Sequence, residues 1–84
     1  MITTCENTYF RGVNYKKAIG HNIREVRLEK GLSQEKLAWA AKINVSHLST
    51  VELGQSNVSI ETMMKIAKAL NVPFERIVRG VNWE

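Results

Sequence analysis

The spacing of apolar residues predicts that the chain becomes helical at about Lys16 and continues as a series of helices almost to its end. From there, apolar positions recur three or four residues apart, as on one face of an amphipathic helix. In the first helix these positions are Ala18, Ile19, Ile23, Val26 and Leu28. Gly31 is expected to end this helix, because glycine adopts a left-handed cap conformation without steric cost. Residues 1–15 have no helical period and are interpreted as an arm or a short extended segment.

Polar residues that favour helix starts divide the rest of the chain into four shorter helices. Ser33, Asn44 and Ser59 can each accept a hydrogen bond from the free N–H groups at the start of a helix. Pro73 suits the first turn of a last, short helix. The apolar residues that the first three of these helices would turn inward are Leu37, Ala38 and Ala41; Leu48 and Val51; and Ile60, Met63, Met64, Ile66, Ala67 and Leu70. The last helix runs through Phe74, Ile77 and Val78. Because no segment alternates with a period of two, apart from possible extended pieces at the ends, the pattern predicts an all-α domain of five helices.

Composition narrows the class of protein. The 84 residues, 44% of them hydrophobic and 24% charged, fit one small soluble domain at residues 16–80, with the arm before it and a tail at 81–84. No run reaches the roughly 18 apolar residues of a membrane helix, and residues 1–15 carry no apolar core of a signal peptide. Cys5 is the single cysteine, so no disulfide can form within the chain and a reducing cytoplasm is the expected location.

The charge is moderately basic and unevenly distributed. Twelve Lys and Arg against eight Asp and Glu give a net charge of +4. Residues 1–32 contribute six basic and three acidic side chains, residues 33–58 are neutral, and residues 59–84 contribute four basic and three acidic ones. This excess is compatible with a polyanionic partner, but it does not by itself identify one.

The middle of the chain carries a motif. Two short helices joined by three or four residues, the second starting with small or polar residues, describe a helix-turn-helix. The order and spacing of residues from Ile19 to Val78 resemble the Cro and lambda-repressor-like family, the XRE-type helix-turn-helix domains. The segments that carry the resemblance are Ile19-Gly20, Ile23-Arg24-Glu25-Val26-Arg27, Lys30-Gly31-Leu32-Ser33-Gln34-Glu35-Lys36-Leu37-Ala38, Val51-Glu52-Leu53-Gly54, Ile66-Ala67-Lys68-Ala69-Leu70, and Phe74 with Ile77-Val78.

This resemblance implies a five-helix lambda-repressor-like DNA-binding domain whose helix-turn-helix occupies about residues 33–54. Residues 44–53 would form the recognition helix in the major groove. Members of the family bind DNA as homodimers, so we expect a two-fold-symmetric operator with half-sites about 34 Å apart. The implied function is sequence-specific transcriptional regulation, as a repressor or a controller protein. The alternative is a protein-interaction module, such as an antitoxin, that uses the same scaffold to bind a protein partner.

Small side chains on the outer face of the implied recognition helix are candidates for contacts with base edges. They are Val45, Ser46, Ser49 and Thr50. Valine and the threonine methyl can pack on a thymine methyl, and hydroxyls can donate to or accept from several bases. Phosphate contacts are expected from Gln34, Asn44, His47, Gln55, Ser56, Asn57, Lys42, Lys36 and Arg24. The plainer alternative for each is a solvated surface side chain, with Asn44 acting only as a helix cap and His47 only partly packed.

Other residues have structural interpretations. The resemblance implies a partly buried ion pair between Arg27 and Glu52 that links the first helix to the third. Lys42 stands where the family usually has glycine, which strains its backbone if φ is positive. Trp39 should face outward, where the N-terminal arm, a partner subunit or another protein could cover it. The dimer interface is predicted to use Phe74, Ile77, Val78, Val81 and Trp83.

Nothing in the sequence indicates an enzyme. The chain has no Ser/His/Asp arrangement, no glycine-rich phosphate loop and no pair of carboxylates with a plausible cleft. Two histidines and one cysteine without clustered carboxylates predict no metal site. Neither a cofactor nor a small-molecule ligand is implied. The expected partners are therefore double-stranded DNA and a second copy of the chain.

Overall fold

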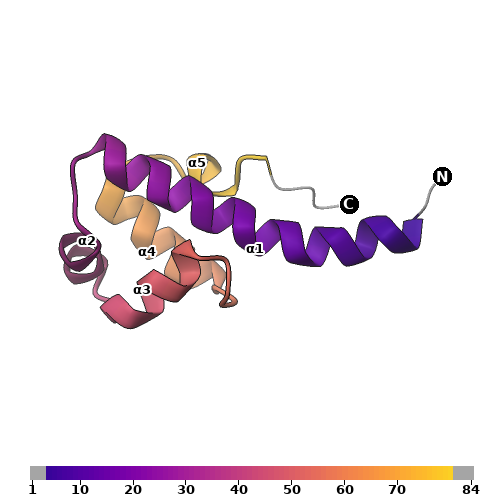
Figure 1. The fold of residues 1–84 in the computed structure, drawn as a ribbon. Helices are drawn as coiled ribbons and strands as arrows, with labels where there is room; N and C mark the ends of the chain where they lie inside the picture. Colours follow the sequence, from indigo (N-terminus) through magenta and orange to yellow (C-terminus); the bar gives the residue numbers. More distant parts are fainter. Residues whose placement is uncertain (1–3, 81–84) are drawn as a thin grey trace.

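A computed structural model describes the backbone of residues 4–80 and the side chains of residues 15–80. The described chain forms helices and turns without a strand (Figure 1), which confirms the all-α prediction. Within residues 4–80, no helix combines the length and hydropathy that crossing a bilayer requires. In chain order the helices are α1 (Thr4–Glu29), α2 (Gln34–Ala41), α3 (Val45–Glu52), α4 (Ile60–Leu70) and α5 (Phe74–Val78).

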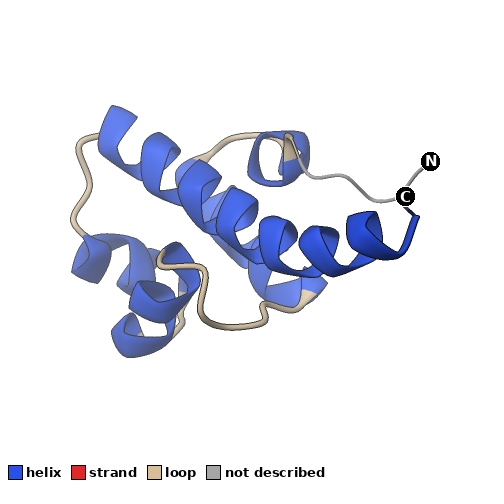
Figure 2. Cartoon of the chain, turned by 45° about the vertical axis from the view of Figure 1, so that its right-hand side comes forward, coloured by secondary structure: helices blue, strands red, loops and turns tan. Residues whose placement is uncertain are grey.

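The first helix is longer than its apolar pattern predicts. α1 begins at Thr4, so residues 4–15 are helical, and the expectation of an extended segment without helical structure is wrong for them. Figures 1 and 2 show the first turns of α1 projecting beyond the other helices. An apolar stripe marks the part of a helix that packs against a core, whereas a projecting helix needs no such stripe. The absence of an apolar period in residues 4–15 therefore did not exclude a helix there.

All five helices contribute to one hydrophobic core. Its buried residues are Ile19, Ile23, Val26, Leu37, Ala38, Ala41, Leu48, Val51, Val58, Met63, Ile66, Ala67, Leu70 and Ile77. Three residues expected to face inward are exposed instead, namely Leu28 and, on α4, Ile60 and Met64. The buried residues of α4 form one stripe, and Ile60 and Met64 lie four residues apart on its flank. No neighbouring helix in the described chain covers that flank.

Side-chain caps begin three of the helices where the sequence predicts. Ser33 Oγ accepts a hydrogen bond from the Lys36 N–H at 3.1 Å, before α2. Asn44 Oδ1 accepts from the Ser46 N–H at 2.7 Å, before α3, and Ser59 Oγ accepts from the Thr62 N–H, before α4. Each cap satisfies one of the backbone donors that a helix start leaves unpaired. The caps therefore fix where α3, the expected recognition helix, begins.

α1 and α3 approach each other at backbone distance. A Cβ added at Gly20 on α1 would overlap the carbonyl oxygens of Val51 and Glu52 at the end of α3. Only glycine leaves room for this approach, because every other residue carries a Cβ. Gly20 thus sets the position of the C-terminal end of α3 relative to α1.

Lys42 ends α2 in a left-handed conformation, with φ of 60°. Its N–H bonds back to the carbonyls of Ala38 and Trp39, as in a helix cap that glycine usually provides. A side chain at positive φ crowds the backbone, so the strain anticipated for a lysine at this position is present. Asn71 caps α4 with nearly the same geometry, but asparagine tolerates this conformation better than lysine does.

We expect Lys42→Gly to raise the free energy of unfolding by about 0.5–1 kcal/mol, because glycine relieves the left-handed strain. Asn71→Gly is the matched control, and it should change the stability less. Urea unfolding followed by circular dichroism measures both. A Lys42→Gly variant less stable than the parent would show that the lysine side chain contributes more through its contacts than its backbone loses through strain.

Candidate nucleic-acid interface

α2 and α3 form the two arms of a helix-turn-helix, joined by the three residues 42–44. α3 buries Leu48 and Val51 and packs chiefly against α1 and α2. Its other face is open, with Val45 and Ser46 exposed and Ser49 half-buried. The structure therefore brings these three predicted base-contacting residues to an outer surface of α3.

Thr50, the fourth predicted base contact, is tied to the loop that follows α3. Its hydroxyl donates to the His47 carbonyl at 2.9 Å and accepts from Ser56 Oγ at 2.7 Å. Thr50, His47 and Ser56 are all half-buried. Because the Thr50 proton is already used, this hydroxyl can offer a base only its remaining lone pair and its methyl group. Thr50 and Ser56 thus hold the loop against α3.

The ion pair between Arg27 and Glu52 is present and nearly sealed from solvent. Arg27 donates from Nε to Glu52 Oε2 at 2.7 Å and from Nη2 to Oε1 at 3.0 Å, and from Nη1 to the Leu32 carbonyl at 2.8 Å. The two side chains are only 10% and 3% exposed, respectively. A bidentate pair of this kind fixes both position and orientation. It fastens α1 to the end of α3 and to the turn before α2.

Gln34, a predicted phosphate contact, belongs to the same network. Its Nε2 donates to Glu52 Oε1 at 3.0 Å, so the carboxylate that anchors α3 also orients the first side chain of α2. The carboxamide keeps its carbonyl oxygen and one N–H for a further partner. Sequence reasoning treated the ion pair and Gln34 separately, because no local pattern reveals a contact between residues 18 positions apart.

A polar hollow of about 220 Å³ lies over this network. It brings together three predicted DNA-contacting residues, Arg24, Gln34 and Ser49, from three different helices. Arg27 and Glu52 form part of its lining, together with the exposed Leu53. The hollow therefore joins the predicted base face of α3 to predicted phosphate contacts on α1 and α2.

The other predicted phosphate contacts are placed less uniformly. Asn57 Oδ1 accepts a hydrogen bond from the Tyr15 hydroxyl at 3.2 Å, which ties the loop after α3 to α1. Gln55 and Lys36 are exposed, and Asn44 is an exposed cap. Lys42 does not join the hollow of Arg24 and Gln34, because it lines a separate hollow between α2 and α4.

The predicted dimer residues are only partly accessible. Ile77 is completely buried, so its assignment to a dimer interface is wrong; its apolar character reflects packing in the core of its own chain. Phe74 and Val78 remain partly exposed. Val81 and Trp83 lie outside the described residues. Phe74 and Val78 line an apolar hollow of about 480 Å³ together with Tyr15, Val58, Ile60 and Met63.

Comparison with known proteins agrees with this geometry. A helix-turn-helix family model matches residues 23–77, which include α2, α3 and α4 completely. The chain belongs to this helix-turn-helix family. The match covers most of the core and both residues of the ion pair, so the family resemblance read from the sequence is confirmed.

The relatives are transcriptional regulators and control proteins. The chain is 40% identical over 60 residues to control protein C.BamHI of Bacillus amyloliquefaciens, covering 70% of this chain and 74% of the relative. It is 36% identical to the helix-turn-helix-type transcriptional regulator DdrOP3 of Deinococcus deserti, over 73% of this chain and 47% of that longer protein. Among solved structures, the restriction-modification controller protein C.AhdI from Aeromonas hydrophila superposes with a TM-score of 0.71 at 39% identity. That superposition covers 73% of this chain and 92% of C.AhdI.

Proposed function

We propose that this protein is a sequence-specific DNA-binding transcriptional regulator of the controller type, which places α3 in the major groove of a two-fold-symmetric operator. The observation that carries the proposal is the open face of α3 beside the hollow that gathers Arg24, Gln34 and Ser49. The names of its relatives, a control protein and a transcriptional regulator, support the same function. Because DNA is its target, the cytoplasm is the proposed location.

The affinity for DNA would come mostly from residues around α3 rather than from α3 itself. The single ionic side chain of α3 is Glu52, and Arg27 already neutralises it. Base contacts would use Val45, Ser46 and Ser49, which carry no charge. Phosphate contacts would come from Arg24, from the oriented carboxamide of Gln34 and from the loop at 55–57, and these contacts position the helix in the groove.

A homodimer supplies the second recognition helix. An isologous interface needs one surface that complements itself across a two-fold axis. The apolar hollow beside α5 and the exposed flank of α4 meet at Ile60, and together they form the apolar surface that we propose for this contact. We define this apolar surface by Ile60, Met64, Phe74 and Val78; it keeps Phe74 and Val78 from the interface predicted from the sequence, omits the buried Ile77 and adds Ile60 and Met64.

A specific observation favours a second candidate function, the binding of another protein. Trp39 is 85% exposed on the outer side of α2. Exposed tryptophans are enriched at protein interfaces, and α2 packs its other side against α3 and α4. A protein-interaction module, such as an antitoxin, would use this side of α2 without any need for DNA.

Selection of bound sequences from a pool of random duplexes at low salt tests the DNA-binding proposal. We expect enrichment of sequences with two-fold symmetry and half-sites about one helical turn apart. Arg24→Ala should then lower the slope of log affinity against log salt by about 0.9, since it removes one phosphate contact. Lys30→Ala removes one positive charge from the exposed turn after α1, outside the predicted contacts, and is the matched control for the change in net charge. Absence of enrichment at low salt would overturn the proposal and leave the protein-binding function.

A further inference from the structure

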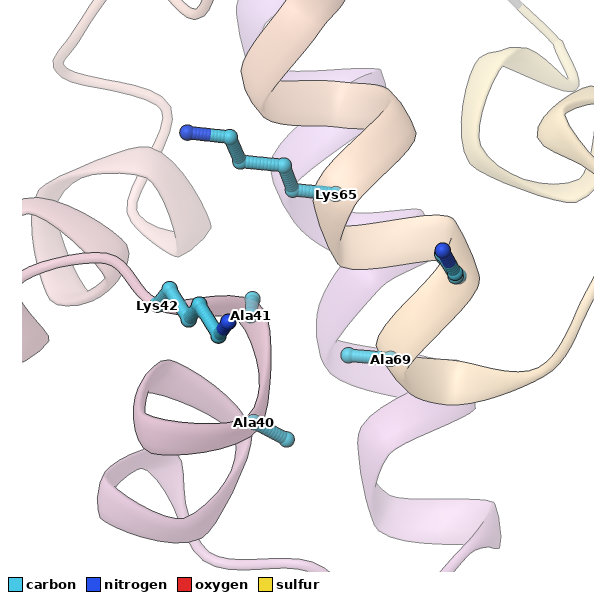
Figure 3. Close-up of a pocket in the computed structure, with 6 residues that line it drawn as sticks. Ala40, Ala41, Lys42, Lys65 and Ala69 are labelled. Carbon is cyan, nitrogen blue, oxygen red and sulfur yellow. The ribbon is translucent and has the colours of Figure 1, made fainter.

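Three lysines from two helices surround a hollow of about 480 Å³ between α2 and α4. Lys42 comes from the end of α2, and Lys65 and Lys68 lie one turn apart on α4. Ala40, Ala41 and Ala69 complete the lining. Figure 3 shows Ala40 and Ala69 facing each other across the gap and Lys65 reaching from α4 toward the side of α2. The alanines leave the space open, and the lysines supply positive charge at its rim.

The positive charge in this hollow is not compensated locally. No ion pair involves Lys42, Lys65 or Lys68 within residues 15–80. Glu61, one turn before Lys65, borders the neighbouring hollow with Lys65 and Lys68 but forms no ion pair with either. Three like charges that border one hollow without a counter-charge repel one another, so an anion bound in the hollow is favoured.

Lys42 adds an independent observation. It holds its left-handed backbone conformation although glycine would hold it without strain. The strain is a local cost, and such costs cluster where a side chain has a function in binding. In Figure 3 the side chain of Lys42 lies along Ala41, beside the hollow.

The hollow lies apart from the proposed base-reading face. Figure 3 shows the lining residues in the gap between α2 and α4, with α1 behind α4. α3 packs against α1 and α2 and has no major contact with α4. None of the residues that line the hollow over the ion pair also lines this one.

We propose that Lys42, Lys65 and Lys68 form a second phosphate-binding site, outside the helix-turn-helix face. Ammonium groups are compact point charges that bind phosphate oxygens without needing a planar partner. Three of them around one small hollow suit a ligand that concentrates several negative oxygens in a short span. Such phosphates come either from DNA that flanks the operator or from a free oligophosphate. The DNA source rests on the proposed function, whereas the oligophosphate source does not.

The first experiment uses tripolyphosphate as the probe and follows backbone amide shifts by NMR. We expect the amides of Ala40, Ala41 and Ala69 to shift. The double variant Lys65→Ala/Lys68→Ala should bind tripolyphosphate roughly tenfold more weakly, since each exposed ion pair contributes about two- to fivefold. The control Lys16→Ala/Lys30→Ala removes the same charge from α1 and from the turn that follows it, and it should leave these shifts and the affinity unchanged.

The second experiment uses DNA. The selected operator is compared as a short duplex and as one extended by about two helical turns on each side. If flanking DNA fills the hollow, Lys65→Ala/Lys68→Ala should lower the slope of log affinity against log salt for the long duplex by about 0.9 for each lysine. The slope for the short duplex should not change.

A positive result in either experiment supports the site and identifies its ligand. The proposal fails if both probes respond alike to the double variant and its control, or if a peptide of eight glutamates shifts the three alanine amides at lower concentration than tripolyphosphate. A protein that binds no DNA but binds tripolyphosphate here would refute the proposed function and retain this site.

Discussion

Replacing Glu52 with alanine should lower the free energy of unfolding by about 3–5 kcal/mol, because it leaves the Arg27 guanidinium buried without its counter-charge. Arg27 is 10% exposed and donates two of its three hydrogen bonds to Glu52. Only the bond to the Leu32 carbonyl would remain. Small domains are stable by about 5–15 kcal/mol in total, so this loss is a large share. Urea unfolding followed by circular dichroism at neutral pH measures it.

A double variant separates the cost of an orphaned charge from the value of the pair itself. Arg27→Met combined with Glu52→Leu removes both charges and keeps the volume apolar, so it should recover most of the stability that Glu52→Ala loses. As a further comparison, Glu29→Ala removes a carboxylate from the exposed pair with Arg76 and should cost less than about 1 kcal/mol. A Glu52→Ala variant that is no less stable than Glu29→Ala would show that the pair is not sealed from water as described.

The consequences of Glu52 extend to the DNA-binding face through Gln34. The carboxylate holds the Gln34 amide at 3.0 Å, so the apolar double variant would recover the fold but release Gln34. The same side chain therefore contributes to stability through Arg27 and to the proposed interface through Gln34. This link explains how α3, which is short and nearly uncharged, can present an ordered surface.

Local signals made much of the fold predictable from the sequence. Ser33, Asn44 and Ser59 act on the residues that immediately follow them, so their role as caps can be recognised without knowledge of the rest of the structure. The ion pair of Arg27 with Glu52 was expected from the family resemblance, not from local pattern. The link from Glu52 to Gln34 was not expected at all, since it exists only once α2 and α3 are packed together.

The errors share one physical cause. The period of apolar residues indicates which helix faces can be buried, but neighbouring helices decide which of them are. Ile60 and Met64 continue the apolar pattern of α4 and are nevertheless exposed, whereas Ile77 fits a surface role by its late position and is fully buried. Conversely, residues 4–15 lack the pattern and are helical. The period of apolar residues therefore identified the helix faces that can be buried. Only the tertiary structure showed which of these faces a neighbouring helix covers.

Ile60→Glu should raise the dissociation constant of the proposed homodimer by at least about a hundredfold, as expected when a charge replaces a central apolar contact. Ile60 is 62% exposed in the single chain and borders both hollows of the apolar surface. It is also the first residue of α4, where the positive end of the helix dipole favours a carboxylate. The substitution should therefore leave the monomer folded and act on association alone.

Sedimentation without DNA is the decisive measurement for this variant, because it excludes direct repulsion between the new carboxylate and phosphates. Leu28→Glu is the matched control. Leu28 is 55% exposed on α1, and the substitution adds the same negative charge away from the apolar surface. We expect the parent and Leu28→Glu to associate equally and Ile60→Glu to remain monomeric at tens of micromolar. A dimer binds both half-sites of the operator at once, which raises its affinity above that of a monomer for one half-site. The affinity of Ile60→Glu for the operator should therefore also fall. Equal association of all three proteins would place the dimer interface elsewhere, and a monomeric parent would remove the homodimer from the proposed function.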